Sequence, residues 1–155
     1  MKKIRLLWLV CIMAVLPALP AGADQKVYRA KLSGAQEVPS VKTPAKGDLK
    51  IIYTGGAEMS FELNVKRITS PTAAHIHHGK KGENGPPVAG LFGGPVKMGK
   101  FKGILAEGLI TEESLMGELE GKTVEDLARL IESGETYVDV LTVTYPLGEL
   151  RGQIK

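Results

Sequence analysis

The sequence predicts an all-β protein, either an antiparallel β-sandwich or a Greek-key barrel of about seven or eight strands, with one short helix near residues 123–133. Three observations favour this fold class. Several short segments alternate apolar and polar residues with a period of two. Clusters of glycine and proline separate these segments, as turns do. Only one segment carries apolar residues at helical spacing, so helices are not the main layer.

The clearest alternation lies in residues 57–65, which we expect to form a strand with one buried face. Residues 47–53 alternate in the same way, and Thr54-Gly55-Gly56 between the two segments is a short turn sequence, so the pair predicts a hairpin. Further strands are expected at residues 25–32, 73–78, 87–92, 101–110, 137–145 and 149–154. Residues 68–72, centred on Pro71, are expected to form a turn.

The expected helix begins after Thr123, a good N-cap, and has Glu125 and Asp126 in its first turn, where the helix dipole favours negative charge. Gly134 stands where a C-cap glycine belongs. Residues 112–121 fit either a further helical turn or a loop.

The N-terminus predicts a secretory signal peptide at residues 1–23. Lys2, Lys3 and Arg5 precede an apolar run, and Ala21-Gly22-Ala23 gives the small residues that signal peptidase requires. A membrane anchor is the alternative, but the run is shorter than the roughly 20 residues that span a bilayer. We therefore expect one mature domain at residues 24–155, exported to the periplasm or the extracellular space, with no membrane anchor after cleavage.

Composition narrows the function classes. Cys11 lies inside the signal and follows Val10, which is too large for a lipidation site, so the mature chain lacks cysteine and thiol chemistry. The chain has 20 Lys+Arg and 17 Asp+Glu, and cleavage removes three basic residues, leaving 17 of each sign. A neutral domain gives no broad field for nucleic acid, so no nucleic-acid partner is expected.

The histidines are the main candidates for chemistry. His75 and His77 would share one face of a strand, and His78 would point to the other. Imidazoles are typical ligands of copper and zinc, so these three residues are the candidate metal site. Carboxylate, methionine or backbone ligands would have to complete it, and their spacing singles out none. The alternative is that one histidine packs in the core and the others lie at the surface.

Other motifs point to structure. The glycine-rich loop at residues 79–87 lacks Walker spacing and no helix follows it, so it is not a phosphate site. Glu149 and Arg151 share a face of the final strand and are interpreted as a structural ion pair. The sequence has no nucleophile motif, so no catalytic residue is predicted.

Five segments together resemble the CHRD domain, named after chordin. They are residues 32–39 (LSGAQEVP), 74–79 (AHIHHG), 85–88 (GPPV), 137–140 (YVDV) and 148–153 (GELRGQ). Their order matches across nearly the whole mature chain. The resemblance implies an exported all-β domain, found singly in bacteria, that acts as a binding or interaction module rather than an enzyme. Its partner would be a protein or another extracellular ligand.

The histidine strand also resembles, over a few residues, that of copper/zinc superoxide dismutase. CHRD sequences often read Y-V-N-V-H-T where this chain has Leu141 in place of the histidine. A third imidazole is therefore lost, which argues against dismutase-like redox catalysis. The sequence favours a non-enzymatic binding module, with copper or zinc binding through His75 and His77 as the alternative.

Overall fold

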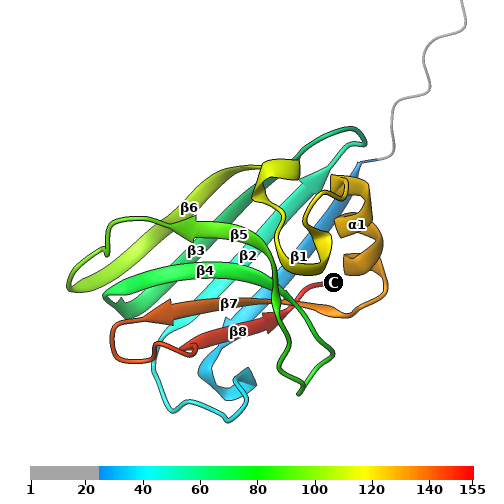
Figure 1. The fold of residues 1–155 in the computed structure, drawn as a ribbon. Helices are drawn as coiled ribbons and strands as arrows, with labels where there is room; N and C mark the ends of the chain where they lie inside the picture. The colour runs from blue at the N-terminus through cyan, green and yellow to red at the C-terminus, as the bar shows by residue number, and fades with distance from the viewer. Residues whose placement is uncertain (1–24) are drawn as a thin grey trace, which may run out of the picture.

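The protein is described by a computed structural model over residues 25–155, which form eight strands and one α-helix (Figure 1). The strands are β1 (Lys26–Ser33), β2 (Lys46–Tyr53), β3 (Met59–Thr69), β4 (Pro71–His78), β5 (Pro87–Gly93), β6 (Lys100–Ile110), β7 (Thr136–Thr142) and β8 (Leu150–Gln153). The helix α1 spans Val124–Glu132. The signal peptide predicted at residues 1–23 lies outside the described residues.

All eight strands belong to one antiparallel sheet with the order β5-β4-β7-β8-β1-β2-β3-β6. In Figure 1, β5, β4, β7 and β8 lie in front of β1, β2, β3 and β6, so the sheet folds over on itself. Its two outermost strands, β5 and β6, come into contact, and the sheet is a nearly closed barrel. The predicted all-β class is confirmed.

The β2–β3 hairpin shows why these segments are strands. The predicted hairpin forms, with Leu49 opposite Leu63 and Ile51 opposite Phe61. These side chains point into the barrel and are buried, whereas Lys50 between them is exposed. Alternation in the sequence therefore becomes an apolar interior and a polar exterior.

Two expected boundaries were wrong. Residues 68–72 were expected to form a turn, but β3 runs to Thr69 and β4 begins at Pro71, so the chain reverses around Ser70 alone. Ser70 has a φ of 49°, and its hydroxyl oxygen accepts a hydrogen bond from the Gly99 amide at 3.0 Å, which holds this unusual conformation. The strand expected to reach Tyr145 ends at Thr142, where the chain turns.

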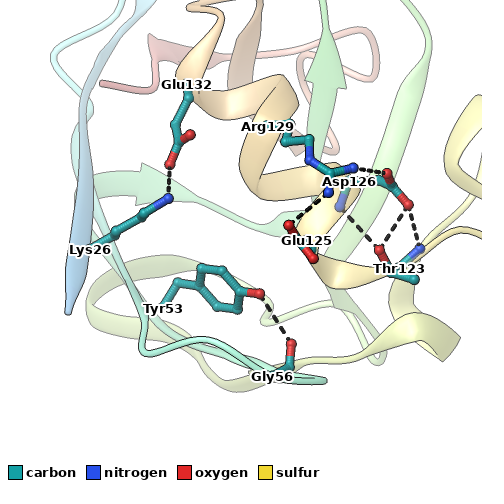
Figure 2. Close-up of polar contacts among 8 residues, drawn as sticks. All are labelled: Lys26, Tyr53, Gly56, Thr123, Glu125, Asp126, Arg129 and Glu132. Carbon is teal, nitrogen blue, oxygen red and sulfur yellow. Dashed lines mark hydrogen bonds and ion pairs between the residues drawn. The ribbon is translucent and has the colours of Figure 1, made fainter. Parts of the chain in front are cut away.

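The helix is confirmed, and Figure 2 shows how it begins and where it attaches. Thr123 and Asp126 form a reciprocal capping box, in which the Thr123 hydroxyl accepts from the Asp126 amide at 3.2 Å. Glu132 at the other end bonds the Lys26 ammonium at 2.7 Å, linking α1 to β1. Residues 112–121, left open between helix and loop, form two short 3-10 turns, η2 (Glu112–Ser114) and η3 (Gly117–Leu119).

None of the helices within residues 25–155 is long and apolar enough to cross a membrane.

The outer face of β7 is unusual for a barrel, because it is buried as well. Val138 and Val140 point into the barrel and belong to the core. Tyr137 and Asp139, on the opposite face, are only 2% and 5% exposed. Loops must therefore cover this outer face, and they create a second, polar interior.

Candidate functional site

The strand β4 carries the three histidines, and it separates them as the alternation predicts. His75 and His77 lie on the outer face with ring centroids 6.0 Å apart, edge to face. In the ladder with β7, His75 is opposite Asp139 and His77 is opposite Tyr137. Burial lowers the pKa of both imidazoles below the usual value, so they are neutral at pH 7.

His78 points the other way and meets different groups. Its Nδ1 contacts the Glu118 carboxylate, and its Nε2 lies 3.3 Å from Oε2 of Glu135. Glu135 also pairs with the Lys80 ammonium at 3.2 Å. His78 therefore joins the end of β4 to η3 and to the segment after α1. The structure does not bring it together with the other two histidines.

Three planar groups stack along the outer face. The imidazole of His77 lies on the Tyr137 ring with centroids 5.0 Å apart and 19° between planes. The Arg151 guanidinium carbon lies 3.5 Å from the same ring centroid. Because β7 lies between β4 and β8, the two groups reach Tyr137 from opposite neighbouring strands. Such stacking fixes all three side chains.

The loop between β4 and β5 folds over this stack. Arg151, only 2% exposed, donates to the carbonyl oxygens of Lys80 (3.0 Å) and Glu83 (2.6 Å) and to Oδ1 of Asn84 (2.8 Å). Asn84 in turn donates to the Val38 carbonyl at 2.7 Å, which ties the loop to the connection between β1 and β2. The glycine-rich loop is thus held by a buried cation.

Arg151 and Glu149 go to different partners. The expected ion pair is not among the contacts of residues 25–155; Glu149 instead accepts a hydrogen bond from the Thr43 hydroxyl at 2.6 Å. Glu149 is 6% exposed, so both residues are buried. Each one anchors a separate loop, Glu149 the segment before β2 and Arg151 the segment after β4.

Gly85 fixes the tautomer of His77. The Nδ1 of His77 lies 2.9 Å from the Gly85 carbonyl oxygen, which can only accept, so Nδ1 carries the proton. The Tyr137 hydroxyl accepts from the Gly85 amide at 3.1 Å. In a neutral imidazole the other nitrogen, Nε2, is then an acceptor. It is buried and has no hydrogen-bond partner among the described residues.

Next to the stack lies a pair of carboxyl groups that the sequence did not single out. Glu37, directly after the 3-10 turn η1 (Gly34–Gln36), and Asp139 on β7 are within hydrogen-bond reach of each other. Burial, reinforced by the neighbouring Asp139 charge, raises the pKa of Glu37 to about 8. Burial also raises the pKa of Asp139 to about 6, although the Glu37 hydrogen bond and the Arg151 charge oppose the shift. At pH 7 the pair therefore holds one proton.

Gly148 makes room for the two carboxyl groups. A Cβ at this position would lie 2.7 Å from Oδ1 of Asp139 and 3.0 Å from Oε1 of Glu37. Those two oxygens are buried and have no hydrogen-bond partner within residues 25–155. Only a glycine lets the turn before β8 approach so closely.

These groups line one cavity of about 510 Å³ on the outer face of the barrel. Its polar wall holds Glu37, Asp139, His77, Tyr137 and Asn84, and its apolar wall holds Val38, Pro39, Val41, Pro146 and Leu147. The volume suits a small ligand, since small-molecule sites usually measure about 300–1,000 Å³. Three segments distant in the sequence, within residues 37–41, 77–85 and 137–148, meet here.

The arrangement does not form a metal centre by itself. Among residues 25–155, no group of three or more His, Cys, Asp and Glu side chains could hold a metal ion. The sequence named His77 but missed Glu37, Asp139 and Tyr137. One signal was present, because Asp139 interrupts an otherwise apolar and aromatic run in β7.

The model of one family, the CHRD domain, matches residues 28–154. The match covers β2 to β8 in full, all of β1 except its first two residues, and the candidate cavity. No curated protein matches the chain, and no solved structure matches it either.

Proposed function

The chain belongs to the CHRD domain family, and from this premise we propose that it is a non-enzymatic binding module whose ligand occupies the cavity on the outer face of β7. The observation that carries the proposal is the set of buried acceptors on the cavity wall. Oε1 of Glu37, Oδ1 of Asp139 and Nε2 of His77 have no partner among the described residues. Leaving a buried polar atom unpaired costs about 1–3 kcal/mol, and a bound ligand removes that cost.

Rigid support for these groups also favours binding. Arg151 holds the loop that covers the stack, and Tyr137 is fixed between two neighbouring strands. A cavity whose walls are set before the ligand arrives loses little conformational entropy on binding. The barrel supplies the scaffold, and its loops supply the site.

A mixed panel of pentylamine, pentanol, pentanoate and glucose tests the binding site by NMR. We expect at least one probe to shift the amide signals of Gly85 and Gly148. Val41→Trp, which fills the cavity, should abolish the shifts, whereas Val27→Trp on the exposed face of β1 should keep them. Shifts that survive Val41→Trp, or a panel that leaves both signals unmoved, contradict the proposed site.

The protein is also proposed to act outside the cytoplasm, which rests on the signal sequence at residues 1–23. Fractionation of cells that produce the full chain should recover it from the periplasm or the medium. Mass spectrometry should give a product that begins at Asp24. An uncleaved chain in the cytoplasmic fraction would contradict export.

Copper or zinc binding is a second candidate, favoured by the placement of His75 and His77 on one face with centroids 6.0 Å apart. Titration of Cu(II) and Zn(II) into the purified protein tests it. Tight stoichiometric binding that the double variant His75→Ala/His77→Ala loses would establish a metal site. Weak binding, or binding that the double variant retains, would leave the histidines in a structural role.

A further inference from the structure

We infer that the cavity binds a primary alkylammonium group, with Glu37, Asp139 and His77 as the acceptors of its three N–H bonds. The inference rests on the proposed function, because it names the ligand class for the same cavity. It follows from the donors and acceptors on the polar wall, the charge of that wall and the apolar wall opposite.

The donors on the polar wall are already engaged, because the Tyr137 hydroxyl donates to the Gly85 carbonyl and the Asn84 amide donates to the Val38 carbonyl. Glu37 and Asp139 are more than nine-tenths buried, line the cavity, and each has an oxygen with no partner in residues 25–155. His77 presents Nε2 as a third acceptor, since its proton is on Nδ1 facing Gly85. The proton shared by the two carboxyl groups is the one donor that these side chains supply among themselves. A fitting ligand must therefore bring hydrogen-bond donors.

The negative charge of the carboxyl pair favours a cationic ligand over a neutral hydrogen-bond donor. Asp139 is ionised at pH 7, and the shared proton is lost when a positive charge replaces it, which leaves two carboxylates facing the ligand. Arg151 is the nearest protein cation, but its donors bond the loop oxygens of Lys80, Glu83 and Asn84. It lowers the cost of ionising the pair without occupying its oxygens.

An ammonium fits better than a metal ion. Zinc and copper need ligands that converge to about 2.0–2.3 Å, and no three suitable side chains in the described part of the chain do so. An ammonium group accepts longer contacts, with N···O distances of about 2.7–2.9 Å, and its three donors diverge. Glu37, Asp139 and His77 line the same cavity, so an ammonium group among them has three acceptors within one site.

The apolar lining of the cavity suits an alkyl stem. Val38, Pro39, Val41, Tyr145 and Leu147 contribute to it. Methylene groups against such side chains gain about 0.8 kcal/mol for each one that is buried. An amine on a chain of four or five carbons would place its charge among the carboxylates and its stem on this wall.

Release of the proton that Glu37 and Asp139 share would be a specific signature of ammonium binding. The titratable and charged groups that face Glu37 are Asp139 on β7, Arg151 on β8, and His77 and Tyr137 in the stack. Because the cation displaces the shared proton, binding at pH 7 should release close to one proton. Affinity should then rise by up to about tenfold per pH unit below pH 8.

The test compares pentylamine with pentanol and pentanoate by NMR titration at pH 7.5. Pentylamine should bind at least tenfold more tightly than pentanol, and pentanoate more weakly than both. The double variant Glu37→Gln/Asp139→Asn should abolish the preference, and Glu132→Gln, an exposed carboxylate on α1, should retain it. Calorimetry in phosphate and in HEPES measures the released proton through the difference in apparent enthalpy.

The outcomes separate the two proposals. Equal binding of pentylamine and pentanol in the cavity, or no proton release, overturns the ammonium inference and leaves the binding site intact. Failure of all three probes overturns the ammonium inference, and if glucose also leaves the Gly85 and Gly148 signals unmoved, the binding site is overturned as well. A further titration uses Nα-acetyl-lysine methylamide, which carries the same ammonium group on a lysine side chain. If it binds more tightly than pentylamine, the natural ammonium group belongs to a lysine side chain. If it binds more weakly, the natural ligand is a free small amine.

Discussion

Charged side chains occur in two contrasting settings in this barrel. Around α1 they meet at the surface, where Lys26, Glu132 and Arg129 each have an ionic partner and remain in contact with water (Figure 2). Over the outer face of β7 they meet beneath loops, where Arg151 is almost completely buried and two carboxyl groups share a proton. The first arrangement resembles an ordinary protein surface, and the second resembles a binding site.

The comparison separates charged groups that are bonded within the fold from charged groups that still have unbonded polar atoms. Exposed pairs are screened by water and salt and stabilise little. Buried charges are costly unless every donor and acceptor is matched. Arg151 donates three hydrogen bonds to loop acceptors, whereas Glu37 and Asp139 each keep one buried oxygen with no partner among the described residues. Substitutions matched between the two regions test the contrast.

The largest expected effect is that of Arg151→Leu. It removes the donors to Lys80, Glu83 and Asn84 and the contact with Tyr137, so the free energy of unfolding should fall by at least about 3 kcal/mol. Urea unfolding at pH 7 measures the change. Arg129→Leu removes an exposed guanidinium from α1 and should shift the midpoint far less. Equal losses would show that burial does not distinguish the two regions.

A smaller loss is expected for Gly148→Ala, because the new methyl group would overlap the carboxylates of Asp139 and Glu37. We expect a cost of about 2–3 kcal/mol from overlap and backbone strain together. Gly55→Ala is the matched control: its φ is also positive, but nothing lies within 4 Å of the added Cβ. The control should cost about 1 kcal/mol. Similar losses at both sites would mean that the backbone, and not the acid pair, requires glycine.

The smallest expected effect is a change in how stability depends on pH. The pKa of Glu37 is raised in the folded state, to about 8, so the native protein binds more protons than the unfolded chain above pH 4.5. The contribution of Glu37 to stability should therefore fall by about 1–2 kcal/mol between pH 6 and pH 7.5, whereas His75 and His77, whose pKa values burial lowers, contribute in the opposite direction. Chemical denaturation of the ligand-free protein at several pH values measures the total slope, and the difference between the native protein and Glu37→Gln isolates the Glu37 contribution.

Glu132→Gln provides the opposite case. Hydrogen bonds from Lys26 and Tyr28 lower the pKa of Glu132, so its stabilising contribution is present above the unfolded pKa and is lost as the solution becomes acidic. This substitution should leave the slope between pH 6 and pH 7.5 unchanged. A slope that persists in Glu37→Gln but disappears in Glu132→Gln would reverse the assignment.

Local signals predicted the fold well. Period-two alternation located β2 and β3, and the Thr123 cap located the start of α1, because each depends on residues close in sequence. The sharp reversal at Ser70 was missed, since proline at 71 reads as a turn residue but serves as the first residue of β4. Short-range sequence patterns do not show which residue adopts a backbone conformation with a positive φ angle, as Ser70 does.

The site was harder to predict, for a physical reason. Alternation identifies the two faces of a strand, but it does not show that a loop will bury the polar face. Glu37 and Asp139 lie more than 100 positions apart, and only the closed barrel brings them together. Metal binding by His75, His77 and His78 stays a prediction. Two of the three partners of Arg151 are backbone carbonyls, which no sequence pattern of side chains identifies.

The pairing of β1 with β8 has a consequence for biosynthesis. Arg29 exchanges backbone hydrogen bonds with Lys155, at 2.7 and 2.9 Å, and Ser33 faces Arg151 across the ladder. Strand β1 emerges early from the ribosome, yet one of its edges stays open until β8 has been made. Arg151 also arrives with β8, so no nascent chain that stops short of it can fasten the loop or shape the cavity. The covering loop and the cavity therefore take their final shape together, in a single step that follows the synthesis of β8.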